Sequence, residues 1–91
     1  MLTLRIVTPL AALPQVQCDS IRLPVCDDET GKGGGSYGIR TGHTKALFSL
    51  GQGEIMALTA GEIILAGKCQ GGFASVDQDI VTAVVEGFTN Q

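Results

Sequence analysis

The sequence has 91 residues, the size of one small domain; 44% of them are hydrophobic and only 4% are aromatic. The formal net charge is −3 and the six basic residues are scattered singly, so no basic stripe indicates nucleic-acid binding. No stretch approaches the roughly 20 apolar residues that a membrane-spanning helix needs. We therefore expect a soluble protein with a core of Val, Ile, Leu and Ala.

Strands are expected along most of the chain. Residues 2–6 alternate apolar and polar, and residues 20–25 alternate again, where Pro24 predicts an edge strand or a bulge. Residues 27–35 form a polar, glycine-rich stretch that predicts a loop. Further strands are expected at residues 46–50, 54–58, 62–66, 69–76 and 80–85, with turns at 51–53, 67, 71–72 and 77–79. Turns every 8–12 residues predict an all-β fold, a β-sandwich of two mostly antiparallel sheets with about ten short strands.

The segment Ser36-Tyr37-Gly38-Ile39-Arg40-Thr41-Gly42-His43 carries the only histidine of the chain. Two glycines frame it, and the turn dipeptide Thr41-Gly42 stands just before His43. We interpret the segment as a loop displayed by a sheet, and such loops often carry function. A catalytic base would need a partner nucleophile or carboxylate, and the sequence shows no such constellation. On the residues alone, His43 is better explained as a hydrogen-bonding support of its loop than as a functional group.

Two glycine-containing patterns resemble nucleotide-binding motifs but lack the context that such motifs need. Gly33, Gly35 and Gly38 satisfy GxGxxG, yet strand and turn residues follow them where a helix should begin. Gly67-Lys68-Cys69 resembles the end of a phosphate loop, but the earlier glycine is missing and Cys69 replaces the required Ser or Thr. One histidine and cysteines without metal-ligand spacing argue against zinc. We expect neither a cofactor nor a metal.

The three cysteines are Cys18, Cys26 and Cys69. Cys18 and Cys26 flank one extended segment, so they would lie about 26 Å apart along it. A disulfide needs Cα atoms within about 7 Å of each other. We therefore expect reduced thiols of a cytosolic protein that serve as small core or edge residues.

Five stretches of the chain resemble one family in the same order. They are residues 4–9, 21–25, 36–43, 47–55, and 71–76 with 80–86. These stretches are similar to the N-terminal β-sandwich of the epsilon subunit of F-type ATP synthases, which reads Glu-Leu-Gly-Ile-x-Pro-Gly-His at the third stretch. Each match is weak alone, but together they cover nearly the whole chain, so residues 1–91 are expected to form a single epsilon-type domain. Thr41 stands where the family usually has proline, which makes the turn less rigid.

The resemblance implies a non-catalytic subunit of the central stalk, peripheral on the cytoplasmic face of the membrane. Such a subunit couples ion-driven rotation to ATP synthesis, and its partners would be the gamma subunit and the ring of c subunits. The ring-facing loop would be residues 36–43, and the gamma-facing candidates would be Thr8, His43, Thr44 and Lys45. The family continues into a C-terminal helical hairpin that acts as a brake and, in some bacteria, binds ATP. This sequence stops at Gln91, so we expect neither braking nor ATP binding.

Two other classes of function remain open on the sequence. The first is a stand-alone β-sandwich module that binds a peptide or a small ligand, and the second is a small enzyme. Co-purification separates these classes, because a rotor subunit travels with gamma and c subunits while a binding module travels with a partner of its own.

Overall fold

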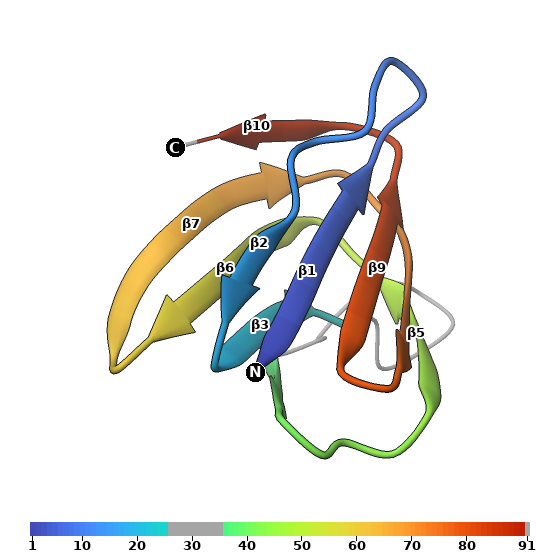
Figure 1. Cartoon of the computed structure of the whole chain (residues 1–91). Coiled ribbons are helices and arrows are strands. Elements are labelled where there is room, and N and C mark those ends of the chain that lie inside the picture. Colours follow the sequence, from blue (N-terminus) through green and yellow to red (C-terminus); the bar gives the residue numbers. More distant parts are fainter. Residues whose placement is uncertain (26–35, 91) are drawn as a thin grey trace.

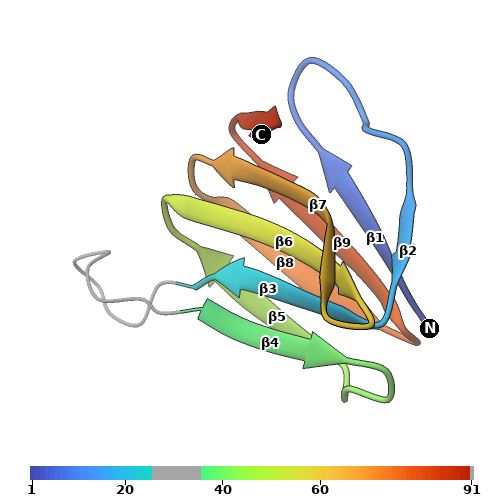
Figure 2. The same cartoon turned by 90° about the vertical axis from the view of Figure 1, so that its left-hand side faces the viewer.

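Ten strands make up two five-stranded sheets that pack face to face (Figures 1 and 2). The computed structural model describes residues 1–25 and 36–90, and these contain no helix. The strands are β1 (Leu2–Val7), β2 (Val16–Cys18), β3 (Ser20–Pro24), β4 (Ser36–Arg40), β5 (Ala46–Leu50), β6 (Gly53–Thr59), β7 (Glu62–Cys69), β8 (Gly72–Asp77), β9 (Ile80–Val85) and β10 (Phe88–Asn90). The prediction of an all-β sandwich with two mostly antiparallel sheets is confirmed.

The first sheet has the strand order β2-β1-β9-β8-β5, and the second sheet has the order β10-β7-β6-β3-β4. Every pairing is antiparallel except that of β1 with β9, which is parallel and places Thr3 opposite Ile80 and Val7 opposite Val84. Strands β8 and β9 form a tight hairpin, whose turn residues Gln78 and Asp79 have φ of 50° and 64°. Two consecutive positive φ values suit the right-handed twist of a hairpin.

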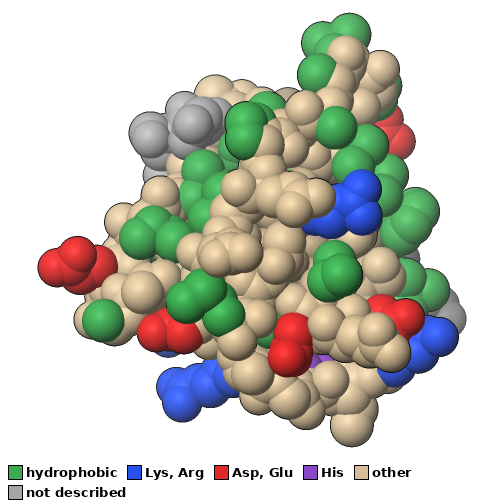
Figure 3. All heavy atoms as spheres, viewed as in Figure 1, with side chains coloured by type: hydrophobic (Ala, Val, Ile, Leu, Met, Phe, Trp, Pro, Cys, Tyr) green, Lys and Arg blue, Asp and Glu red, His purple; other side chains and the backbone are tan. Residues whose placement is uncertain are grey.

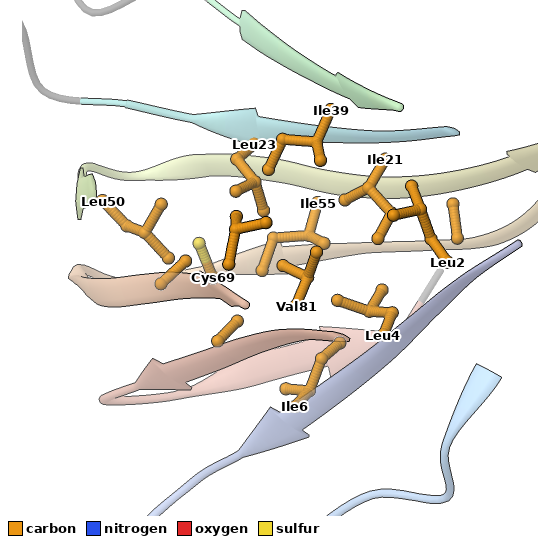
Figure 4. Packing of buried hydrophobic residues seen from close by; sticks show 14 of the residues in the cluster. Leu2, Leu4, Ile6, Ile21, Leu23, Ile39, Leu50, Ile55, Cys69 and Val81 are labelled. Carbon is orange, nitrogen blue, oxygen red and sulfur yellow. The ribbon is translucent and has the colours of Figure 1, made fainter. Parts of the chain in front are cut away.

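The inward-facing side chains of both sheets meet in one aliphatic core (Figure 4). The alternation along β1 and β9 decides which residues enter it, because successive strand residues point to opposite faces. Among the described residues no polar or charged side chain is buried. The buried residues are Leu2, Leu4, Ile6, Cys18, Ile21, Leu23, Ile39, Leu50, Ile55, Ala57, Cys69, Ala74, Val76, Val81, Ala83 and Val85.

The expectation of an edge strand or bulge at Pro24 is wrong for β3 as a whole, but Pro24 itself lies where β3 pairs with β4 alone. Strand β3 lies between β6 and β4, and its pairing with β4 runs through Pro24 without a shift in register. The proline is tolerated because it ends β3, beyond Arg22, where the register with β6 stops. Its ring occupies the space next to Gly53, where a Cβ would lie 2.6 Å from the Cβ of Pro24.

The turn expected at Gly67 is also absent, because β7 runs unbroken from Glu62 to Cys69. Gly67 is buried inside this strand, and a Cβ there would collide with the ring of Phe88. The glycine therefore makes room for an aromatic ring from β10. The short strands β2 and β10 were not predicted from the sequence.

The cysteines agree with the expected role as small core residues where the structure describes them. Cys18 and Cys69 are free and buried, and Cys69 Sγ lies 3.6 Å from the carbonyl oxygen of Gly51. Burial raises the pKa of both thiols, because the thiolate would lose its hydration. Cys26 and the predicted loop at residues 27–35 lie outside the described residues. No helix in the described ranges is long and apolar enough to cross a membrane.

We predict that Ile55→Ala lowers the free energy of unfolding by about 2–5 kcal/mol, because Ile55 is fully buried and its truncation leaves a cavity. The matched control is Ile63→Ala on the neighbouring strand, where the side chain is 57% exposed. Urea unfolding measures both variants. Equal losses at the two positions would show that the core is not where we place it.

We also predict that stability falls as the pH rises above about 8.5, the pKa of an exposed thiol. In that range the unfolded chain releases protons from Cys18 and Cys69, while the folded chain holds them because the pKa of each thiol is raised. The unfolded state then binds fewer protons than the folded state, so the free energy of unfolding decreases. The Cys18→Ala, Cys69→Ala double variant should show a smaller decrease over the same pH range.

Candidate functional site at the turn between β4 and β5

The candidate segment is a strand followed by a turn, which corrects the interpretation of residues 36–43 as a loop. Residues 36–40 form β4 and pair with β3 in register, with Ile39 opposite Ile21. The turn begins at Thr41, and Gly42 has φ of 88°, a conformation that favours glycine. Strand β4 is an edge of the second sheet and β5 is an edge of the first, so the turn passes from one layer to the other (Figure 2).

Hydrogen bonds fasten this turn to the β8–β9 hairpin beside it. The Gly42 N–H donates to Asp79 Oδ1 at 2.8 Å, and the His43 N–H donates to the Arg40 carbonyl at 3.2 Å. Lys45 Nζ lies 3.8 Å from Asp77 Oδ2. Both side chains of that ion pair are largely exposed, so the pair contributes little to stability. The turn is thus held mainly through Asp79.

His43 uses both ring nitrogens inside the site. Its Nδ1 lies 2.7 Å from the Thr44 carbonyl oxygen, and its Nε2 lies 3.0 Å from the Tyr37 hydroxyl. A carbonyl oxygen can only accept, so Nδ1 carries the hydrogen; in the neutral ring Nε2 then accepts from the Tyr37 hydroxyl. This geometry supports the interpretation of His43 as a loop-supporting residue, because both ring nitrogens have hydrogen-bond partners in the turn and on β4.

Three rings cover the side of the sandwich between the edges β4 and β5. The ring centroids of Tyr37 and Phe48 are 4.7 Å apart, and the His43 ring lies 5.8 Å from Tyr37 and 6.0 Å from Phe48. Phe48 also packs against the aliphatic core. Offset and edge-to-face contacts of this kind add to the area that the rings bury. The aromatic cluster, defined as Tyr37, His43 and Phe48, therefore joins the turn to the core.

The gamma-facing candidates do not form one cluster. His43, Thr44 and Lys45 lie in the turn, whereas Thr8 lies in the loop at the opposite end of the molecule (Figure 1). Thr8 has a local structural role, because its Oγ1 lies 3.0 Å from the Ala11 carbonyl and accepts from the Ala11 N–H at 3.1 Å. One small contact patch therefore cannot contain all four residues.

The outer face of the first sheet carries apolar side chains that the sequence reasoning did not single out. Leu47 is 72% exposed, Phe73 is 52% exposed and Ile80 is 43% exposed. The register places Phe73 opposite Val84, and Val84 opposite Val7, so an apolar row crosses three strands. The signal in the sequence was an apolar residue at some of the outward positions of the alternating strands, such as Phe73 in β8 and Val84 in β9. Strand register was needed to read it, because periodicity alone does not say which face is buried.

The described residues contain no group of three His, Cys, Asp or Glu side chains that could hold a metal ion. Figure 3 shows acidic and basic side chains mixed along the lower end of the molecule, with only a small part of the imidazole visible between them. This end of the molecule therefore presents charges of both signs to the solvent.

We predict that Asp79→Ala increases the hydrogen-exchange rate of the Gly42 amide and destabilises the fold by about 0.5–1.5 kcal/mol, through the lost hydrogen bond. Asp79→Asn is the matched control, because its side chain keeps an oxygen at the acceptor position and also tolerates the positive φ. NMR-detected exchange compares the three proteins. Unchanged protection of Gly42 in Asp79→Ala would mean that the turn is not held through Asp79.

No protein-family model matches the sequence, and a search of curated proteins finds no match. Among solved structures, a chain in the cryo-EM structure of the Euglena gracilis mitochondrial ATP synthase (OSCP, F1 and c-ring, rotational state 1) is similar, with a TM-score of 0.80, 18% identity, and 98% of this chain and 52% of that chain covered. A chain in the central stalk and c-ring structure of the Tetrahymena thermophila mitochondrial ATP synthase has a TM-score of 0.72 and 14% identity, with 96% and 64% covered. This chain thus spans between half and two thirds of either neighbour. At such identities the likeness shows a shared fold, and it agrees with the resemblance found in the sequence.

Proposed function

We propose that this chain is a non-catalytic, epsilon-type subunit of the rotor of an F-type ATP synthase. The observation that carries the proposal is the shared fold over 98% of the chain with a chain of an ATP synthase structure. The five stretches of sequence that resemble the epsilon family, in the same order along the chain, support the same family. The rotor role, the partners and the peripheral position at the cytoplasmic face of the membrane follow from that family and are parts of the proposal.

The outer face of the first sheet is the surface that we propose to dock on the gamma subunit. Leu47 and Phe73 are exposed on it, and large apolar side chains on an open sheet face are typical of a contact surface. This face borders Lys45 at one end and Thr8 at the other. A partner that lies along its whole length would contact both groups of gamma-facing candidates, although they are at opposite ends.

Strand β4, together with the turn residues 41–43 that follow it, is the surface that we propose to face the ring of c subunits. Torque passes through a contact only if neither side yields, and close-packed interiors resist deformation. The Gly42 to Asp79 hydrogen bond and the aromatic cluster both make this turn stiffer than a free loop. The family usually has a proline at the position of Thr41, and a proline would stiffen the turn. In this chain, contacts with the β8–β9 hairpin and with β5 stiffen the turn instead.

Site-directed cross-linking in the purified synthase tests this orientation. In a Cys26→Ser background, Thr41→Cys should link to the polar loop of a c subunit, and Leu47→Cys should link to gamma. Lys68→Cys, on the outer face of the second sheet, is the control and should link to neither. Links from Thr41→Cys to catalytic-head subunits alone would contradict the orientation. A chain that fails to co-purify with any synthase subunit would favour a stand-alone binding module.

A further inference from the structure

Gly38 lies in the middle of β4, and the described fold does not require a glycine there. Its φ is not in the left-handed region, and a Cβ built on it meets no described atom within 4 Å. Gly53 and Gly67 differ, because a Cβ at either position would collide with a neighbouring side chain. A glycine inside a strand weakens the strand and often marks a place where a ligand or another backbone approaches closely. Gly38 therefore points to a contact outside this chain.

Two arginines flank Gly38 on the outer face of the second sheet. Arg22 is directly opposite Gly38, and Arg40 is opposite Ser20, so the two arginines are diagonal neighbours about 7–8 Å apart at their Cα atoms. Both side chains are exposed. They line a hollow of about 680 Å³, which also includes Leu58 and Gly61. The hollow thus combines two guanidinium groups with the backbone of Gly38, which no side chain covers.

The charge of this hollow is opposite to that of the whole chain. Among the described residues, Asp19 is the one acidic residue that lines it, and its Oδ2 already accepts the Ala60 N–H at 2.9 Å. Two guanidinium groups against one carboxylate leave the hollow positive in a protein with a net charge of −3. Glu54 on β6 is also a diagonal neighbour of Arg22, and it faces Lys68 across the β6–β7 pair. The hollow therefore suits a carboxylate from outside.

Strand β4 is an edge of its sheet, so its outer backbone groups can pair with a further strand. A strand added there would lie about 4.7–4.9 Å from β4 and would place one side chain next to Gly38 on the outer face. Because Gly38 has no side chain, a glutamate at that position can cross over β4 and reach Arg22. Arg40 follows two residues along the same face, within reach of the same carboxylate.

We propose that the β4 edge binds an extended acidic segment of a partner protein by strand addition, with a carboxylate over Gly38 between Arg22 and Arg40. Main-chain hydrogen bonds supply affinity in this mode, and the side-chain contacts supply specificity. The inference rests on the proposed function, because β4 is part of the proposed ring-facing surface and the inference names the kind of partner segment that would bind there. Its test uses the isolated chain, so the two proposals can fail separately.

The probe is the peptide acetyl-Glu-Val-Glu-Val-Glu-amide, titrated into the isotope-labelled full chain and followed by NMR. Saturable shifts are expected for the amides of β4 and Arg22. The matched Gln-Val-Gln-Val-Gln peptide should bind about tenfold more weakly, because it lacks the charge-assisted bonds to arginine. Arg22→Gln with Arg40→Gln should abolish this preference for glutamate. Arg5→Gln with Lys68→Gln makes the same change in net charge elsewhere and should preserve it.

Gly38→Val tests directly whether a glutamate side chain of the partner passes over β4 at Gly38 to reach Arg22. A β-branched residue suits a strand, so the variant should fold while its side chain blocks the path to Arg22. Loss of the glutamate preference is expected. Equal binding of the two peptides to the native chain, or shifts centred away from β4, would overturn the inference. Inorganic phosphate that shifts the same amides at least as strongly as the peptide would also overturn it in favour of a small-anion site. Cross-links to the c ring would stand in either case.

Discussion

Each sheet has an apolar inner face, and the two faces are removed from water only by packing against each other. The rest of the structure depends on this one aliphatic layer. No described polar side chain is buried in it, so no directional side-chain bond selects the register of a strand. Alternation does this instead, because a shift of one residue would turn every core side chain to the solvent. The parallel pair of β1 and β9 shows the result, with buried Leu4 beside buried Val81 and buried Ile6 beside buried Ala83.

The layered core also determines what the β4–β5 turn must do. Strand β4 ends in one sheet and β5 begins in the other, and packed sheets are about 10 Å apart. The chain crosses that distance in residues 41–45, and the side chains around the crossing close the open side of the sandwich. His43 belongs to this closure, since its two nitrogens bond to Thr44 and Tyr37 and its ring packs near Phe48. The only histidine thus has a structural role in closing the sandwich.

Strands with a clear alternation could be predicted from the sequence, and β1 and β9 were found close to their observed bounds. Strand β4 could not, because Gly38 has low strand propensity in a segment of five residues, and the pairing with β3 makes the segment extended. The unbroken course of β7 through Gly67 depends on Phe88, which comes from a distant part of the sequence. The hydrogen bond from the candidate segment to Asp79 could not be predicted, because it involves a hairpin that no local pattern could place beside the segment.

The same core explains why so little sequence identity accompanies so close a fold. Many aliphatic residues of suitable volume can fill an inward position, so a sandwich of this kind can be kept at an identity as low as the 18% found with the Euglena chain. Outward positions are not under that constraint. Phe73 on the first sheet and Arg22 on the second sheet are exposed and do not pack in the core. Gly38 weakens β4, and the described fold does not require a glycine at this position. What distinguishes this chain from others of its fold must therefore be sought on its two outer faces and at its free edges.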